Sequence, residues 1–295
     1  MTRRPKSRLP PRLPDPARER PAPLPKAPSA RDRLKDAHVA GRSARFSHDD
    51  VVGVMHAVVD GDADALLGLP PFAEFEMSQA TMAMEAVFGW HGDGPRARID
   101  PKRTVAGFTS ACTRVLEVAR AGGRLVFATA RPASLFGVYR TLARAAAGVG
   151  GKVLSAPAAP IDESQRVWWI DDVAMVSDGE SLLADVSGAA ADELLFVLPR
   201  PDLVVADHAF AGVALASGLE VVALADLDAV ALAVAAWRGM AVRVAPFDQH
   251  RTPTAYDPLL DLLAEAVAAP TDPLSIDTAC ADTGPSGHSG SRATT

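Results

Sequence analysis

The second half of the chain alternates short aliphatic runs with alanine-rich stretches of helical length. The aliphatic runs cover residues 125–128, 203–206, 221–225 and 241–245, and each is followed by polar residues. Strands that are buried on both faces appear as continuous aliphatic runs, and their alternation with helices is typical of βαβ units. The pattern predicts an α/β fold with a Rossmann-like parallel or mostly parallel sheet and flanking helices.

The first half shows a different periodicity. Ser47, followed by two aspartates, predicts the capped start of an amphipathic helix, because its hydroxyl can accept an unpaired N–H of the first turn. Residues 75–88 and 104–120 carry apolar positions at helical spacing. We therefore expect a helical N-terminal part over residues 44–122 that packs on a Rossmann-like part over residues 123–268. Together these two parts would form a single domain.

A segment between the first and second aliphatic runs favours β-structure of another kind. Residues 167–184 contain two apolar stretches, the second of which ends at Asp178-Gly179. Asp-Gly is a common hairpin turn because both residues tolerate a left-handed backbone. We expect a β-hairpin or a sheet edge here.

Both ends of the chain lack such patterns. Residues 1–36 hold nine prolines and eleven basic residues against four acidic ones. Proline at this density blocks helix and sheet hydrogen bonds, so we expect a disordered basic tail over residues 1–40. The segment 271–295 is rich in Thr, Ser, Gly and Asp, and we expect a second disordered tail there.

Composition excludes several classes of protein. With 295 residues, 48% of them hydrophobic, the chain can bury a full core, and two cysteines cannot form a disulfide scaffold. The net charge of −6 gives no strong nucleic-acid signal. Acidic residues interrupt the longest apolar stretch, 213–236, which argues against a membrane span, and no apolar export segment follows Arg3-Arg4. We expect a cytoplasmic protein, of an oligomeric state that the sequence leaves open.

The polar residues that follow the predicted strands are the candidates for chemistry. In an open parallel sheet, ligands bind outside the carboxyl ends of the strands, where helix N-termini also present free N–H groups. Four groups of residues should therefore line one edge of the sheet. They are Thr129 with Arg131, Asp207 with His208, Asp226 with Asp228, and Asp248 with His250 and Arg251.

The first group is suited to bind an anion. Pro132 favours the first position of a helix, which leaves nearby backbone donors free. The hydroxyls of Thr129 and Ser134 and the planar guanidinium of Arg131 could complete a phosphate site, with Arg251 as a further cation. The alternative is an ordinary helix start whose arginine faces solvent.

The other groups could supply catalysis. Asp207 with His208, and His250, are candidates for general acid, base or nucleophile. Asp207, Asp226 and Asp178 could hold Mg²⁺, since carboxylates are the ligands that this ion prefers. Each also has a structural alternative, because Asp207 and Asp226 are suitable helix caps and Asp178 suits a turn.

Several known signatures are absent. The sequence has no phosphate-binding Gly-x-x-x-x-Gly-Lys-Ser/Thr loop and no Gly-x-Gly-x-x-Gly after a candidate strand. It also has no His-Glu-x-x-His, Cys-x2-Cys or Gly-x-Ser-x-Gly. Ala-Thr-Ala-Arg-Pro at 128–132 is similar to the second motif of haloacid-dehalogenase phosphatases, but the nucleophilic Asp-x-Asp-x-Thr strand end is missing.

Three segments, 125–134, 201–212 and 250–256, resemble a family of uncharacterised actinobacterial proteins labelled phosphatases, over about residues 45–268. The resemblance implies a phosphomonoester hydrolase that acts on a small phosphorylated metabolite, and it carries no catalytic residues with it. The alternatives are a non-catalytic Rossmann-like module that binds a phosphosugar or nucleotide, and a scaffold whose basic tail recruits an anionic partner.

Overall fold

A computed structural model describes residues 27–92, 94–184 and 187–269 of the chain. The helices are α1 (Ala30–Asp36), α2 (His48–Asp60), α3 (Met77–Phe88), α4 (Pro101–Arg120), α5 (Pro132–Gly148), α6 (Gly188–Val197), α7 (His208–Ala216), α8 (Val230–Trp237), the 3₁₀ helix η2 (Pro253–Tyr256) and α9 (Asp257–Ala268). The strands are β1 (Gly41–Ser47), β2 (Arg96–Ile99), β3 (Arg124–Ala128), β4 (Lys152–Val153), β5 (Ala159–Pro160), β6 (Arg166–Ile170), β7 (Val173–Ser177), β8 (Leu182–Leu183), β9 (Leu203–Ala206), β10 (Val221–Ala225) and β11 (Val242–Pro246).

The central sheet has the order β11-β10-β9-β3-β7-β6-β5. Strands β11, β10, β9, β3 and β7 are parallel, whereas β6 and β5 add an antiparallel edge. The chain leaves β3 toward β7 on one side and later returns to β9 on the other side. The carboxyl end of β3 is therefore a topological switch point, the place where open α/β sheets bind ligands. The predicted mostly parallel sheet with flanking helices is confirmed.

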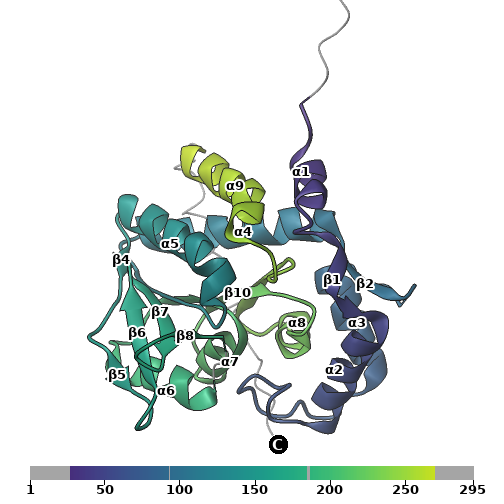
Figure 1. The fold of residues 1–295 in the computed structure, drawn as a ribbon, viewed down its shortest axis with the longest axis horizontal. Coiled ribbons are helices and arrows are strands. Elements are labelled where there is room, and N and C mark those ends of the chain that lie inside the picture. The colour runs from purple at the N-terminus through teal and green to yellow at the C-terminus, as the bar shows by residue number, and fades with distance from the viewer. Residues whose placement is uncertain (1–26, 93, 185–186, 270–295) are drawn as a thin grey trace, which may run out of the picture.

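Helices cover both faces of this sheet, and alternate residues of each inner strand point to one face or the other. In β3, Leu125 and Phe127 pack on the face of α4, α5 and α9, while Val126 and Ala128 pack on the opposite face with α7 and α8. Figure 1 shows α4, α5 and α9 on one side of the sheet and α6 and α7 on the other. Two hydrophobic cores result, which explains why these strands are apolar without interruption.

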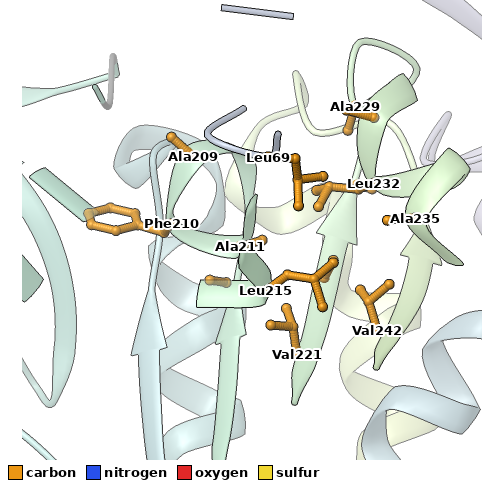
Figure 2. Close-up of a cluster of buried hydrophobic side chains, with 14 of the residues drawn as sticks. Leu69, Ala209, Phe210, Ala211, Leu215, Val221, Ala229, Leu232, Ala235 and Val242 are labelled. Carbon is orange, nitrogen blue, oxygen red and sulfur yellow. The ribbon is translucent and has the colours of Figure 1, made fainter. Parts of the chain in front are cut away.

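The segment that follows α2 packs into one of these two cores. Figure 2 shows Leu69, from the segment after α2, among side chains of α7, β10 and α8. The chain approaches α7 so closely that a Cβ atom on Gly212 would lie 1.9 Å from the carbonyl oxygen of Leu67. Only glycine fits at this position, and it fixes the segment around Leu67 on the first turns of α7.

The N-terminal part is less purely helical than its periodicity predicts. Helix α2 begins after Ser47, which forms the predicted cap together with Asp50. Helices α3 and α4 also form, but β1 and β2 add an antiparallel ribbon that the sequence did not indicate. Moreover, α4 packs on β11 as a flanking helix of the sheet, where Gly107 allows close contact with Pro246.

One local prediction was wrong for part of its range. Within the proposed disordered tail over 1–40, residues 30–36 form α1, which Ser29 caps and which buries Leu34 against α4 and α9. The basic residues that suggested a coil are partly used here, since Arg33 pairs with Asp261 of α9. Residues 1–26 and 270–295 lie outside the described residues, so the rest of both predicted tails is not tested.

The predicted β-hairpin or sheet edge over residues 167–184 is confirmed. Asp178-Gly179 does form a turn, between β7 and β8, but the main hairpin joins β6 to β7 through Asp171 and Asp172. Both aspartates have a left-handed backbone, and Asp171 pairs with Arg144 of α5. Strand β7 is an inner strand, because it pairs with β3 on one side and with β6 on the other. Its residues are buried on both faces. Within the described ranges, no helix combines the length and the apolar composition that crossing a membrane requires.

Candidate active site

Four neighbouring strands end in two level pairs, and β10 and β11 extend two residues past the ends of β3 and β9. Ala128 of β3 lies beside Ala206 of β9, and Ala225 of β10 lies beside Pro246 of β11. The polar groups that follow these strands are therefore brought to one edge of the sheet, as the sequence predicted.

The adjoining carboxyl ends of β3 and β9 are called here the inner crevice. There Asp207, which follows β9, bonds to the loop that follows β3. One carboxylate oxygen accepts a hydrogen bond from the Ala130 backbone N–H at 2.6 Å. The other accepts from the Thr129 hydroxyl at 2.7 Å and from the Tyr139 hydroxyl at 3.1 Å. Asp207 is at the N-cap position of α7 but makes no capping hydrogen bond with its side chain. Its carboxylate instead fixes the loop that carries Arg131.

Arg131 lies at the centre of the site. Its Nε donates to the side-chain oxygen of Gln249 at 3.0 Å, and Nη2 donates to Asp228 at 2.6 Å. Nη1 lies 2.6 Å from Nε2 of His250, and Nη2 lies 2.6 Å from Nε2 of His208. A guanidinium group that touches two imidazoles and a carboxylate provides a concentrated set of donors for an oxyanion.

The crevice between β10 and β11, the outer crevice, contains Asp226, Asp248 and His250. Nδ1 of His250 lies 3.0 Å from a carboxylate oxygen of Asp226. Because a guanidinium group can only donate, Nε2 of His250 must accept from Arg131, and Nδ1 must carry the proton that Asp226 accepts. Asp226 thus fixes the tautomer of His250 and presents its basic nitrogen to Arg131.

Burial and charge shift the pKa of two carboxyl groups in opposite directions. Asp226 is fully buried, and burial raises its pKa, with the hydrogen bond from His250 opposing and the charges of Asp228 and Asp248 adding to the rise. Burial also acts on Asp228, but the hydrogen bond from His208 and the nearby positive charges outweigh it and lower the pKa of Asp228 to about 2. The two neighbouring carboxyl groups therefore differ in how readily they lose their protons.

His208 has an unusual backbone and an unusual environment. Its φ of +45° places it in the left-handed region, at a cost of about 1–3 kcal/mol for a residue other than glycine. Its Nε2 touches Arg131, which can only donate, and lies 3.4 Å from Asp228, which accepts. Without a proton this ring nitrogen can accept from Arg131, and with one it can donate only to Asp228.

A cleft of about 790 Å³ opens from His208 and Asp228 toward solvent. Its walls come from β1, α2 and the loop after α2, with side chains that include Phe46, Asp49 and Asp64. The Phe46 ring also packs edge-on against His250, with ring centres 5.8 Å apart. The N-terminal part of the chain thus builds the wall of a cleft that reaches His208 and Asp228 of the strand-end site, and the volume suits a ligand of metabolite size.

Arg131 reaches the cleft through His208 and Asp228, which line it, whereas the other predicted phosphate ligands bond elsewhere in the site. The Thr129 hydroxyl is fully buried and is already used by Asp207 and by the Arg131 N–H. The Ser134 hydroxyl contacts the Arg131 carbonyl oxygen at 3.4 Å. Arg251 donates to Asp248 at 2.8 Å. These three side chains bond to other residues of the site and do not line the cleft.

The predicted metal ligands Asp178, Asp207 and Asp226 are not brought together. Asp178 is exposed, and its carboxylate accepts from the N–H groups of Glu180 and Ser181 in the β7–β8 turn. Within the described residues, the group with metal-binding geometry is instead Asp226, Asp248 and His250, whose ligand atoms all lie within 4.8 Å of one another.

Sequence reasoning missed several parts of this site. Gln249 follows β11 and is fully buried, although glutamine is polar. The chain has only two tyrosines, Tyr139 and Tyr256, and their hydroxyls donate to the Asp207 carboxylate and to the Asp248 backbone oxygen. A hydroxyl on an otherwise apolar segment was a signal that could have pointed to these polar contacts. The cleft wall had no such signal, because it depends on a contact between Leu67 and Gly212 that the sequence does not show.

Four of the seven side-chain N or O atoms that are buried without a partner in the described chain belong to this edge. They are Nδ1 of His208, Oδ1 of Asp228, Nε2 of Gln249 and Nε of Arg251. Unsatisfied groups of this kind are rare in folded proteins, and their concentration here indicates a ligand site. The fold and this edge place the protein among the doubly wound α/β proteins that carry a polar site at the switch edge of the sheet.

Comparison with known proteins places the chain more narrowly. The model of a family described as Phosphatase matches residues 25–270. The chain is also 31% identical over 259 residues to a Streptomyces coelicolor protein named Phosphatase SCO2771, which covers 83% of this chain and 98% of that relative. The chain therefore belongs to this phosphatase family, as its resemblance implied, and the predicted enzyme class, a hydrolase, agrees with the match.

Proposed function

We propose that this protein hydrolyses the phosphomonoester of a small phosphorylated metabolite at the strand-end site. The observation that carries the proposal is the set of contacts of Arg131, whose guanidinium touches His250 and also His208 and Asp228, the two residues of this edge that line the cleft. Family membership supports the reaction class, and the cleft volume supports a substrate of metabolite size.

Arg131 would bind the phosphoryl group. The chief catalytic demand in phosphoryl transfer is to stabilise negative charge on the phosphoryl oxygens, and a preorganised guanidinium does this without rearrangement. The Nη atoms are the part of Arg131 that faces the two imidazoles and Asp228. An incoming phosphoryl oxygen would replace these acceptors, while the buried Asp207 network keeps the loop in place.

The two histidines would move the protons. In this proposal water attacks phosphorus, and its proton goes to Nε2 of His250, which Asp226 holds in the acceptor tautomer. The phosphorus–ester oxygen bond breaks, and protonated His208, beside Asp228, gives its proton to the leaving oxygen in the cleft. The products are inorganic phosphate and an alcohol, and each histidine ends one proton different from its starting state.

Asp226, Asp248 and His250 are the right kinds of ligand for a divalent cation such as Mg²⁺, which would supply further positive charge beside the phosphoryl group. Their contacts fit such an ion poorly, since both nitrogens of His250 are already paired and Asp248 bonds to the cation of Arg251. The steps above therefore use no metal. Rates measured with excess chelator and with added Mg²⁺ should agree within about twofold, and a strict need for Mg²⁺ would assign these three residues to the metal.

Phosphate release from p-nitrophenyl phosphate and from a panel of sugar and nucleoside monophosphates tests the proposal. Arg131→Ala should lower kcat/KM by about 10²–10³-fold, the effect expected when one donor to the transition state is removed. Arg114→Ala is the matched control, because Arg114 is a partly buried arginine that pairs with Glu220 away from the site.

Clean protein that releases no phosphate from any substrate would contradict the proposal, as would an Arg131→Ala variant of undiminished activity. Thermal stabilisation by a phosphorylated compound that is never consumed would support the non-catalytic binding module instead.

A further inference from the structure

Gln249 connects the two halves of the site. Its side chain is fully buried, and its side-chain oxygen accepts the Nε–H of Arg131 at 3.0 Å. Its backbone N–H donates to Asp226 at 2.9 Å, on the same carboxylate oxygen that holds His250. One residue thus ties the guanidinium of Arg131 to the pair formed by Asp226 and His250.

The contact with Gln249 differs from the other contacts of Arg131. The Nη atoms touch His208, His250 and Asp228, two of which line the cleft that a substrate would enter. A phosphoryl group that binds the Nη atoms competes with those contacts. The Nε–H points instead to a buried partner, so the hydrogen bond to Gln249 can persist while the other acceptors are exchanged.

The amide at this position is also informative. Glutamate could accept the same hydrogen bond, but it would neutralise the guanidinium and add a charge beside Asp226, Asp228 and Asp248. An amide accepts the bond and leaves the charge of Arg131 available to the substrate. Its Nε2 is buried without a partner in the described part of the chain, which is unfavourable for folding. Gln249 is therefore better suited to the binding of an anion by Arg131 than to the stability of the fold.

We propose that Gln249 is a positioning residue that holds the guanidinium of Arg131 toward the phosphoryl group without neutralising it. The proposal rests on the proposed function, since it assumes that Arg131 binds phosphate.

Two variants separate orientation from charge. Gln249→Glu keeps the hydrogen bond and adds a negative charge, so the inhibition constant of inorganic phosphate and KM for p-nitrophenyl phosphate should rise about tenfold or more. Gln249→Met removes the hydrogen bond at nearly the same size, so kcat should fall about tenfold or more because Arg131 is no longer aligned. Its inhibition constant for phosphate should change less than the glutamate variant's.

Gln165→Glu and Gln165→Met are the controls, because Gln165 lies in the β5–β6 loop, far along the chain from the site, and its side chain makes none of the site's contacts. A residue with only a structural role would lower the melting temperature in both Gln249 variants and leave kcat, KM and phosphate inhibition of the folded protein unchanged. That result overturns the proposal. Should Gln249→Met fail to fold, Gln249→Leu, which also lacks the acceptor, takes its place.

Failure of the proposed function would look different. If the wild-type protein releases no phosphate, titration calorimetry with inorganic phosphate replaces the assay for all three proteins. Binding that is about tenfold weaker in Gln249→Glu than in the wild type supports the positioning role even without turnover. Equal binding in both proteins, or no binding to the wild type, overturns it.

Discussion

Two aspartates follow neighbouring strands and are both fully buried, yet their surroundings differ. Asp207, after β9, accepts hydrogen bonds from a backbone N–H and two hydroxyls, and all of these donors are neutral. Asp226, after β10, accepts from His250 and two backbone N–H groups, and it lies near the charges of Asp228 and Asp248.

The difference indicates that the inner crevice stabilises the fold, whereas the outer crevice is suited to catalysis. In the inner crevice the acceptors of Asp207 are matched by donors, so the group is well suited to hold a loop and poorly suited to react. In the outer crevice, the charges of Asp228 and Asp248 act on Asp226, and side-chain atoms of nearby Asp228 and Gln249 are buried without partners among the described residues. Sites of this second kind are where catalytic groups are commonly found, because function there opposes stability.

The largest expected effect is on His250. His250→Ala removes the proposed base, and kcat for p-nitrophenyl phosphate should fall about 10²–10⁴-fold, the usual contribution of general acid–base catalysis. The melting temperature should also fall, because the buried Asp226 loses the hydrogen bond from His250, so kcat is measured at a temperature where the variant is folded. His56→Ala, on the exposed face of α2, is the control. A variant that keeps wild-type kcat would remove His250 from the mechanism.

Gly212 should show the next largest effect, on folding rather than catalysis. Gly212→Ala forces the Leu67 backbone away from α7, and overpacking of this kind costs about 1–3 kcal/mol of unfolding free energy or more. Gly137→Ala is the opposite case, because nothing lies within 4 Å of its Cβ position in α5, and it should stabilise the protein by about 0.5–1 kcal/mol. Urea unfolding measures both, and equal stabilities would refute the close contact of the cleft wall with α7.

Asp207→Asn tests whether Asp207, unlike Asp226, has only a structural role. The amide places an N–H group against one of three donors, and the free energy of unfolding should fall by about 1–3 kcal/mol. The folded fraction should keep more activity than His250→Ala does, because Asp207 only holds the Arg131 loop. A variant that is as stable as the wild type and inactive would show that Asp207 takes part in the chemistry.

The smallest expected effect is in the cleft wall. Asp64→Asn removes a negative charge from the wall, and kcat/KM for the dianion of p-nitrophenyl phosphate should rise about two- to threefold at low salt. At high salt the gain should disappear, because exposed charges are screened. Asp192→Asn, an exposed aspartate of α6, should show no gain at either salt concentration. A loss of activity in Asp64→Asn would indicate a direct contact with the substrate.

The sequence predicted the positions of the site better than the roles within it. Uninterrupted aliphatic runs revealed the inner strands, and the polar residues after them converge because parallel strands end at the same edge. Asp207 and Asp226 looked alike in sequence, since each directly follows such a run. Their roles depend on donors such as Tyr139 and His250, which come from distant elements and become visible only in the fold.

The wall of the cleft could not be predicted for the same reason. Its residues lie in β1, α2 and the following loop, and they reach the site through contacts such as Phe46 with His250 that span about two hundred residues. The inner position of β7 was also hidden, because the Asp178-Gly179 turn is a local signal and strand order is not.

A crystal structure of the protein with bound orthovanadate tests the central claim most directly. The account predicts the anion on the Nη atoms of Arg131, within hydrogen-bond distance of both His208 and His250, with the hydrogen bond from Arg131 to Gln249 intact. Vanadate bound elsewhere on the molecule, with Arg131 still paired to Asp228 and both imidazoles, would contradict it.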